Sequence, residues 1–381
     1  MHYLDHAAST PLLPEVRRAV VDALENDYGN PSSVHAIGRR ARQIVEDARD
    51  RVALAVGASA AEIVFTGGGT EGDNLAIKGV AEKLKGNGNH LVTTAFEHHA
   101  VLHTVEWLAE RGFDATIVPV TPEGRAEPDA LAAAVRPNTT VVSVMTVNNE
   151  IGTVQDLEGI VRAVKEKNPN ALVHTDAVQA LGNVPVDLHA WGVDLASFSA
   201  HKLGGPKGVG ALFVRSGVPV EAVLHGGGHE HGMRSGTLNA PGIAGFGVAA
   251  EIAAKEVYDK ADRLGPMRDR LLEGIRAIVP ELVVNGALEH RVPGNLNVCI
   301  PGADGETLLL LLDEAGVACS SGSACQSGAL DPSHVLLAIG TSRELARGSL
   351  RFSLGRASTD DDIDAVLDVL PPIVERARRV A

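Results

Sequence analysis

Aromatic residues, cysteines and long apolar runs are all scarce in this sequence of 381 residues. Aromatic side chains make up only 3% of the chain, so the core must be built from Ala, Val, Leu and Ile. Such residues suit helices that pack on buried parallel strands. No window of about 18 uninterrupted apolar residues occurs, and we expect no membrane span. The first residues lack a basic segment followed by an apolar stretch, so no secretory signal is expected.

Cysteine and positive charge are also in short supply. The three cysteines, Cys299, Cys319 and Cys325, are too few and odd in number for a disulfide framework, which predicts a reducing, cytoplasmic location. The 34 basic residues are outnumbered by 48 acidic ones, and the formal net charge is −14. This balance repels phosphate backbones and argues against direct nucleic-acid binding. It suits a basic partner protein, or simply a soluble surface.

Strand-length apolar runs alternate with helical patterns over the first part of the chain. Helices are expected at 70–85 and 98–111, and strands at 62–66, 91–94, 115–120, 140–147, 171–174 and 195–199, with an added strand at 210–214. Alternation of this kind predicts an α/β fold with a mostly parallel, seven-stranded sheet between helices.

The pattern changes after Pro241, where a long helical region runs toward Ile278. Pro266 is expected to kink or break this helix. Short strands at 282–284, 296–299 and 349–353 then mix with helices at 305–315 and 359–379. We therefore predict a large α/β domain of residues 14–255 and a small α+β domain of residues 1–13 and 256–381.

A glycine-rich run at residues 67–72, GGGTEG, matches the pattern G-x-G-x-x-G. It follows a predicted strand and opens a helix, and Glu97 ends the next strand. This is the fingerprint of an NAD-dependent oxidoreductase, which is one alternative function. The motif is short, and false matches are common in a chain with 41 glycines. Because backbone N–H groups at a helix N-terminus bind any phosphate, we interpret the run, with the Thr70 hydroxyl, as a phosphate cradle.

An acid and a lysine follow two of the predicted strands. Asp176 comes just after the strand at 171–174, and Lys202 follows the strand at 195–199. Ligands bind at the carboxyl ends of parallel strands in α/β sheets. A solvated surface lysine is the simpler interpretation of Lys202. The pair nevertheless matches the needs of pyridoxal 5'-phosphate (PLP), in which a lysine forms a Schiff base and an acid keeps the pyridine nitrogen protonated.

These residues resemble the motifs of fold-type I PLP enzymes in the class V aminotransferase group. Further matches are similar to the group I cysteine desulfurases, the NifS/IscS-like enzymes. The matching segments run in order along almost the whole chain, at 3–8, 29–33, 65–74, 97–98, 147–152, 176–179, 199–202, 225–228, 234–237, 320–325 and 351–356. Departures from the family pattern are His6, Gly69, Gly72 and His231, where Asn, Ala, Ser and Arg are usual.

The resemblance implies roles around the PLP ring. Lys202 would bond to the cofactor and later move the Cα proton, and Asp176 would pair with the ring nitrogen. Gln179 would hydrogen-bond the phenolic oxygen. His98, in preference to His99, would stack on the ring and shuttle protons.

The resemblance also assigns the phosphate and the substrate. Four residues would hold the phosphate: Gly69, Thr70, Ser199 and His201. Thr237 would reach the phosphate of a neighbouring subunit, which implies a homodimer. Asn149 would touch the cofactor or the substrate carboxylate, and Arg351 would bind that carboxylate through its two-pronged guanidinium.

Cys325 lies among small residues in the segment 320–328, SSGSACQSG, which predicts a mobile loop. The resemblance implies that its thiolate takes sulfur from L-cysteine as a persulfide and leaves L-alanine. Acceptors would be iron–sulfur scaffold or tRNA-thiolation proteins, and Cys325 would be the residue able to contact an iron–sulfur cluster transiently. An incidental cysteine in a flexible loop is the alternative. Cys319 is expected to be a buried structural thiol, and Cys299 a core strand residue.

Other functions need different features. Another PLP enzyme, such as an aminotransferase or a selenocysteine lyase, would not need Cys325 as a sulfur acceptor. A non-catalytic sulfur carrier would have no use for the lysine pocket. His225, His229 and His231 have nearly the spacing of metal ligands, but glycines separate them and no acid pair supports them, so we predict no metal site.

Overall fold

A computed structural model describes residues 1–321 and 332–379. Its central element is a seven-stranded sheet in the order β2-β8-β7-β6-β5-β3-β4. The strands are β2 (Ile63–Thr66), β3 (His90–Thr94), β4 (Asp114–Val118), β5 (Thr139–Ser143), β6 (Leu172–Asp176), β7 (Leu195–Ser199) and β8 (Gly210–Val214). Only β8 runs antiparallel to its neighbours in this sheet. The predicted mostly parallel α/β sheet is confirmed.

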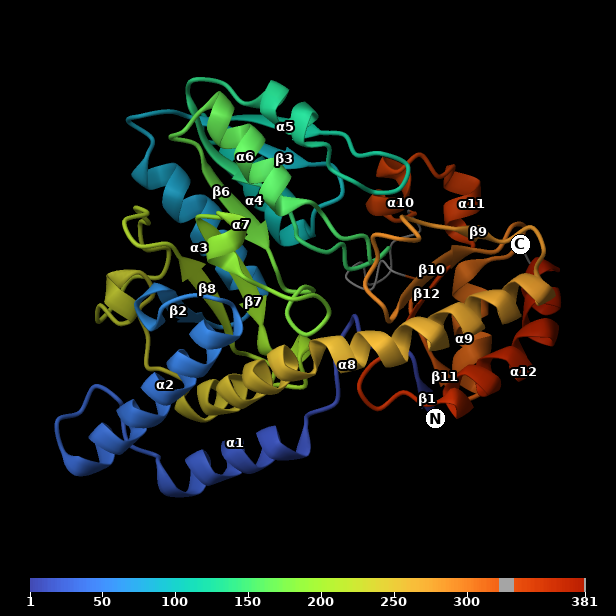
Figure 1. The fold of residues 1–381 in the computed structure, drawn as a ribbon, viewed down its shortest axis with the longest axis horizontal. Helices are drawn as coiled ribbons and strands as arrows, with labels where there is room; N and C mark the ends of the chain where they lie inside the picture. Colours follow the sequence, from blue (N-terminus) through green and yellow to red (C-terminus); the bar gives the residue numbers. More distant parts are fainter. Residues whose placement is uncertain (322–331, 380–381) are drawn as a thin grey trace.

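Helices cover both faces of the large sheet (Figure 1). They are α1 (Pro14–Asn26), α2 (Ala36–Ala55), α3 (Gly69–Lys83), α4 (His99–Ala109), α5 (Pro128–Ala134), α6 (Leu157–Lys167) and α7 (Leu188–Trp191). One core cluster joins α3 and α4 to one face of the sheet, and another joins α2, α6 and the first half of α8 to the other face. Six of the seven strands, all but β4, are therefore buried along all or almost all of their length, as strands covered on both faces are.

A second group of elements forms a smaller core. It comprises α8 (Ala240–Ile278), β9 (Val283–Val284), β10 (Asn295–Cys299), α9 (Gly305–Glu314), β11 (Val317–Ala318), α10 (His334–Ala338), α11 (Arg343–Arg347), β12 (Ser349–Ser353) and α12 (Asp360–Arg378). Three strands pair in the order β12-β10-β9. The N-terminal strand β1 (His2–Tyr3) pairs in parallel with β11, and Leu4 is buried in this core. The first residues of the chain thus pack with its last third.

Helix α8 joins the two cores. Ile243 and Phe246 in its first half lie in the large core, whereas Leu271 and Ile275 in its second half lie in the small one. The helix continues through Pro266, so the expectation of a break there is wrong. Pro266 is exposed, and the carbonyl group that it leaves unpaired can be hydrated while packing fixes both halves of the helix.

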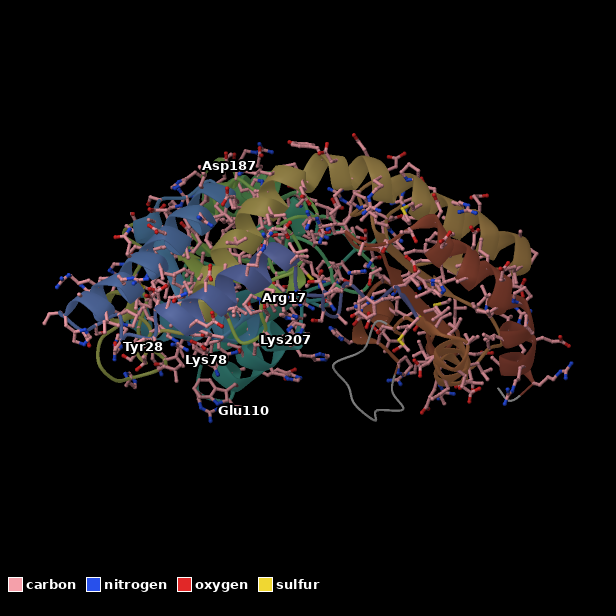
Figure 2. The ribbon with its side chains drawn as sticks, turned by 90° about the horizontal axis from the view of Figure 1, so that it is seen from below. Arg17, Tyr28, Lys78, Glu110, Asp187 and Lys207 are labelled. Carbon is pink, nitrogen blue, oxygen red and sulfur yellow. The ribbon has the colours of Figure 1, made fainter. Side chains whose placement is uncertain are left out.

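The outside of the protein carries many charged side chains, among them Arg17, Glu110 and Asp187 (Figure 2). Within the described part of the chain, none of the helices combines the length and the apolar character needed to cross a membrane.

Candidate active site

The carboxyl ends of β6 and β7 bring the predicted acid and lysine into one region. Asp176 is the last residue of β6 and pairs in register with Ser197 of β7. Its Oδ1 accepts a hydrogen bond of 2.9 Å from the backbone N–H of Val178. Lys202 lies in the short 3-10 turn Ala200–Lys202 that follows β7 directly. The adjacency of two parallel strands therefore places both groups at one edge of the sheet.

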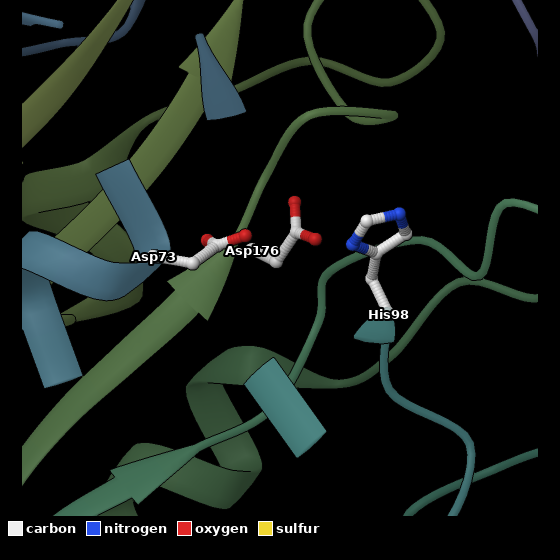
Figure 3. Close-up of side chains that lie close together, drawn as sticks. All are labelled: Asp73, His98 and Asp176. Carbon is white, nitrogen blue, oxygen red and sulfur yellow. The ribbon is translucent and has the colours of Figure 1, made fainter. Parts of the chain in front are cut away.

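His98 and a second acid, Asp73, lie beside Asp176. One carboxylate oxygen of each acid and one ring nitrogen of His98 all lie within 4.8 Å of one another. Figure 3 shows the two carboxyl groups and the imidazole in a row. His98 is the N-cap of α4, and its Nδ1 accepts a 3.1 Å hydrogen bond from the N–H of Ala100. The cap fixes the imidazole at the edge of the site.

Burial dominates the protonation of these groups. It raises the pKa of Asp176, while the nearby charges of His98 and Lys202 act in the opposite direction. Burial also raises the pKa of Glu97 to about 8, although Thr94 and the N–H of Met145 donate to its Oε1. Negative charge in this region is therefore costly unless a cation faces it.

The N-terminal segment closes over the lysine. Lys202 Nζ donates hydrogen bonds to the carbonyl oxygens of Ala7 and Ala8, at 2.6 and 2.9 Å. The side-chain amide of Gln179 donates to the same Ala7 oxygen at 2.9 Å. Two main-chain carbonyl groups thus orient the amine. Side-chain patterns carry no signal for such contacts, and the sequence did not predict them.

A cavity of about 350 Å³ opens beside Lys202. Gln179 and Asn149 also line it, together with His6 and Lys260, and much of the remaining wall is apolar. Asp176 and His98 are not part of this wall. Of the predicted site residues, Lys202, Gln179 and Asn149 therefore share one cavity, with the Asp176 cluster outside its wall.

The predicted phosphate cradle lies at the N-terminus of α3. Gly68 precedes the helix with a φ of 152°, and Gly69 and Thr70 form its first turn. A Cβ atom on Gly69 would lie 2.5 Å from Val178 Cγ2 and 3.7 Å from Ser199 Cβ. Any side chain at position 69 would therefore force Val178 to move. Ser199 at the end of β7 thus packs near the same helix start.

His201 and Thr237 complete the predicted phosphate residues. His201 Nδ1 lies 3.2 Å from Ser9 Oγ, and burial lowers the pKa of its imidazole to about 4. It would therefore offer a phosphate a neutral N–H group. Thr237 is exposed in the segment before α8.

Arg351 on β12 is almost fully buried, with 2% of its surface exposed. Its Nη1 donates to the Asn149 carbonyl oxygen and its Nη2 to Asp5 Oδ1, both at 2.8 Å. Its Nε has no hydrogen-bond partner among the described residues. Asp5 holds one arm of the guanidinium, a contact that the sequence did not predict because 346 residues separate the partners.

Cys325 lies outside the described residues, but both flanks of its segment attach near the site. Ser320 and Arg351 exchange backbone hydrogen bonds of 3.1 and 2.5 Å. On the other flank, Ser333 donates to Glu150 Oε2 at 2.5 Å, and His334 Nε2 lies 2.8 Å from the Glu97 carbonyl oxygen. The described residues on the two flanks, Ser320 and Ser333 with His334, therefore lie beside buried residues.

The two other cysteines are poor nucleophiles. Cys299 is fully buried in β10, as predicted, and burial raises the pKa of its thiol to about 11. Cys319 is only partly exposed and packs against the small core, and burial raises its pKa to about 12. Neither thiol ionises appreciably at neutral pH.

The two sequence alternatives are not supported by the geometry. The dinucleotide fingerprint needs neighbouring β2 and β3, but four strands separate them in the sheet. Within residues 1–321 and 332–379, the atoms of His225, His229 and His231 do not converge to ligand distances.

The chain belongs to the aminotransferase class-V family, whose profile matches residues 2–366. Enzymes of this family depend on PLP, so the predicted family and cofactor are confirmed. A relative named cysteine desulfurase IscS, from Methanosarcina thermophila, is 46% identical over 379 residues, which span 100% of this chain and 93% of the relative.

Solved structures agree with this assignment. A NifS-like protein has a TM-score of 0.93 and 39% identity, and the match covers 98% of this chain and 99% of the other. A structure of SspA in complex with cysteine has a TM-score of 0.80 and 34% identity, covering 93% of this chain and 99% of the other.

Proposed function

We propose that this protein is a cysteine desulfurase, which takes sulfur from L-cysteine, releases L-alanine and holds the sulfur as a persulfide on Cys325. The observation that carries the proposal is the placement of Asp176 and Lys202 at the ends of adjacent strands. The M. thermophila relative is named for this activity, and the SspA neighbour was solved with cysteine.

The chain's own residues fit the cofactor. Asp176 is a buried carboxyl group suited to a ring nitrogen, and Gln179 and His98 would contact the phenolic oxygen and the ring face. Gly69, Thr70, Ser199 and His201 would hold the phosphate, next to a helix N-terminus that favours anions. When bound, PLP withdraws electrons from the substrate Cα and so makes the Cβ–S bond easier to break.

Lys202 would act as the base for the substrate. As an ammonium group it donates to the Ala7 and Ala8 carbonyl oxygens, and it must lose a proton before it can form a covalent bond. The same carbonyl groups would keep the free amine near the substrate while it removes the Cα proton. Lys202 would return a proton when alanine forms.

Arg351 and Asn149 would bind the substrate carboxylate. The guanidinium is desolvated, and its Nε is a buried donor without a partner in the described chain. A carboxylate that replaces Asp5 on Nη2 would meet a charge-assisted donor pair. Substrate binding would then release Asp5 and loosen the N-terminal segment beside Lys202.

Cys325 would take the sulfur in a step that needs no outside oxidant or reductant. Its thiolate forms an S–S bond with the substrate sulfur as the Cβ–S bond breaks, and the electrons of that bond pass to the carbon, which gains a proton. The thiols of Cys299 and Cys319 cannot replace it, because burial keeps them protonated. The persulfide would pass to an iron–sulfur scaffold or a tRNA-thiolation protein.

The proposal includes a cytoplasmic homodimer with two domains in each chain, residues 14–255 and residues 1–13 with 256–381. Large apolar side chains are exposed along α1, α2 and the segment between them, as expected of an interface: Val21, Leu24, Tyr28, Val34 and Ile37. Thr237 would complete the phosphate site of the second subunit. The two domains are supported by the two cores that α8 joins.

Mass spectrometry tests the persulfide directly. After the holoenzyme is treated with L-cysteine, the peptide that contains Cys325 should gain one sulfur atom. Cys325→Ala should keep the visible PLP absorbance and lose sulfide release by at least about a hundredfold, since nucleophilic assistance is lost. Cys319→Ala is the matched control and should retain both. Full turnover by Cys325→Ala would refute the sulfur-transfer step.

A further inference from the structure

Asp176 has a second buried acid as its neighbour. Asp73 on α3 is 1% exposed, and its carboxyl group faces that of Asp176 in Figure 3. Their oxygens lie within 4.8 Å of each other. A carboxyl group without an assigned function at the centre of a site calls for an explanation.

Close packing of α3 on β7 puts Asp73 in this position. A Cβ atom on the preceding residue, Gly72, would lie 3.0 Å from Ser197 Oγ and 3.2 Å from Ser197 Cβ. Any side chain at position 72 would crowd this contact. Gly72 therefore lets the helix approach the sheet and brings the next side chain against the end of β6.

Among the described residues no charged donor hydrogen-bonds to Asp73, although His98 lies within 4.8 Å of both acids. Burial and the neighbouring Asp176 raise the pKa of Asp73, and a hydrogen bond from Ser197 opposes the shift. Asp73 Oδ1 has no hydrogen-bond partner in the described chain, and the nearest ring nitrogen is His174 Nε2 at 3.6 Å. That imidazole already contacts Ser197 Oγ at 3.0 Å and Ser143 Oγ at 2.9 Å. Burial lowers the pKa of His174 to about 3, so it is neutral near pH 7.

The positive groups that face the pair act on Asp176. They are His98, which caps α4, and Lys202, which follows β7; both favour the ionised form of Asp176. Beside Asp73 lies the neutral His174. The buried Glu97 lies near both acids, and its pKa of about 8 keeps it protonated at pH 7. Two carboxylates this close in a dry interior cannot both stay ionised.

We propose that Asp73 is a positioning residue that retains one proton and points a neutral acid at Asp176, so that Asp176 alone presents a negative charge to the cofactor's ring nitrogen. The proton enters from solvent when the two acids are buried together, and no other group changes its bonding. This inference rests on the proposed function for its purpose, because it concerns the acid that would hold the ring nitrogen.

A neutral acid behind Asp176 has a specific effect. Its dipole stabilises the Asp176 carboxylate without adding a second charge that would repel it. An ionised Asp73 would instead push a proton onto Asp176 and remove the charge that the ring nitrogen needs. The proton on Asp73 thus fixes which of the two acids is the active one.

The protonation can be read without the cofactor. Carbon-13 NMR of the cofactor-free protein, labelled at the aspartate carboxyl carbons, should show one resonance that disappears in Asp73→Asn and another that disappears in Asp176→Asn. From pH 6 to 8 the first should stay at the position of a protonated acid and the second at that of a carboxylate. An ionised Asp73 at pH 7 would overturn the inference.

The holoenzyme gives a second readout, the pH at which the visible absorbance of bound PLP changes. Asp73→Asn exchanges one neutral donor for another and should keep this midpoint. Asp73→Ala removes the donor and should raise it by about one pH unit, because Asp176 then holds its charge less well. Asn74→Ala, one residue further along α3, is the matched control and should leave it unchanged. If the midpoint of the absorbance change moved to lower pH in both Asp73 variants, Asp73 would be ionised in the wild type, and the inference would be wrong.

Failure of the proposed function would look different. Wild-type enzyme that releases no alanine from cysteine would refute the desulfurase assignment, yet the carboxyl resonances of the cofactor-free protein would still decide the state of Asp73. If Asp73→Ala does not fold, the NMR comparison with Asp73→Asn decides the same question.

Discussion

Glu97 shows how burial acts on a single residue beside the site. The side chain is completely buried, Thr94 and the N–H of Met145 both donate to its Oε1, and its Oε2 has no partner among the described residues. Burial outweighs the two donors and raises its pKa to about 8. The folded protein therefore keeps a proton on Glu97 across the physiological range, whereas the unfolded chain loses it near the ordinary glutamate pKa of 4.5.

This difference predicts a dependence of stability on pH. Because the folded pKa is raised, the contribution of Glu97 is fully present below about pH 4.5 and is lost as pH rises to about 8. Glu97→Gln keeps the acceptor oxygen and cannot ionise, so its advantage over wild type should grow across that window, to about 4 kcal/mol at pH 8. Thermal unfolding of the cofactor-free proteins from pH 5 to 8.5 measures it. Parallel curves for the two proteins would contradict the pKa assignment.

At this scale, sequence reasoning identified side chains and missed their partners. Asp176 and Lys202 were predicted because strand ends in α/β sheets collect ligands, and the structure places them together. The Ala7 and Ala8 carbonyl groups were not predicted, because every residue has a main-chain carbonyl group and the residue type does not show which ones contact a site. The position of Asp73 beside Asp176 was not predicted. It depends on how closely α3 packs on β7 at Gly72, and this tertiary contact cannot be read from the sequence.

Among the secondary-structure elements, α10 has an unusual start. Its N-cap, Ser333, accepts hydrogen bonds from the N–H groups of Val335 and Leu336, while its hydroxyl donates to the buried carboxylate of Glu150. One hydroxyl thus satisfies the helix end and a buried acid. Burial raises the pKa of Glu150, and this hydrogen bond opposes the shift.

Ser333→Ala should therefore cost more than the loss of an ordinary cap. We expect about 2–3 kcal/mol, since a cap contributes about 1 kcal/mol and a buried acceptor is also left unpaired. Ser342→Ala is the matched control, because Ser342 caps the neighbouring helix α11 through Leu345 in an exposed position. It should cost about 1 kcal/mol. Urea unfolding of both variants measures the difference, and equal losses would show that the Glu150 contact contributes nothing.

Long helices and strands were predicted from the sequence more successfully than short ones. The helix expected at 70–85 is observed at Gly69–Lys83, and the strand expected at 349–353 has those bounds. The five-residue helices α10 and α11 are too short to show a 3.6-residue period, and they were not predicted. Their packing against Phe96 and Met145, far away in the sequence, is what makes them helical.

For the whole molecule, alternation of strands and helices predicted a parallel sheet but not the order of its strands. That order separates β2 from β3 by four strands, and it removed the dinucleotide-binding alternative. The continuity of α8 was also hidden from the sequence, because Pro266 has the local chemistry of a helix break. Packing of both halves in separate cores overrides that local preference.

This competition can be measured. If α8 is one continuous helix held through Pro266 by its two ends, Pro266→Ala restores a backbone N–H donor and removes a steric conflict in the helix interior. We expect a gain of about 2 kcal/mol, after allowing for the greater freedom of the unfolded chain. Pro241→Ala is the control: this proline lies in the first turn of the same helix, where its missing N–H is not needed, and no gain is expected.

Urea midpoints of wild type and the two variants decide the matter. A gain at position 266 alone means that the helix bears the strain of an interior proline because the small core and the large core each hold one half of it. A loss at position 266 would mean that the chain needs the proline to bend there, and that the two cores are joined by two helices with a corner between them. Because the Lys202 turn lies with the large core and Arg351 in the small one, the stiffness of α8 then bears directly on how firmly the two halves of the site are held together.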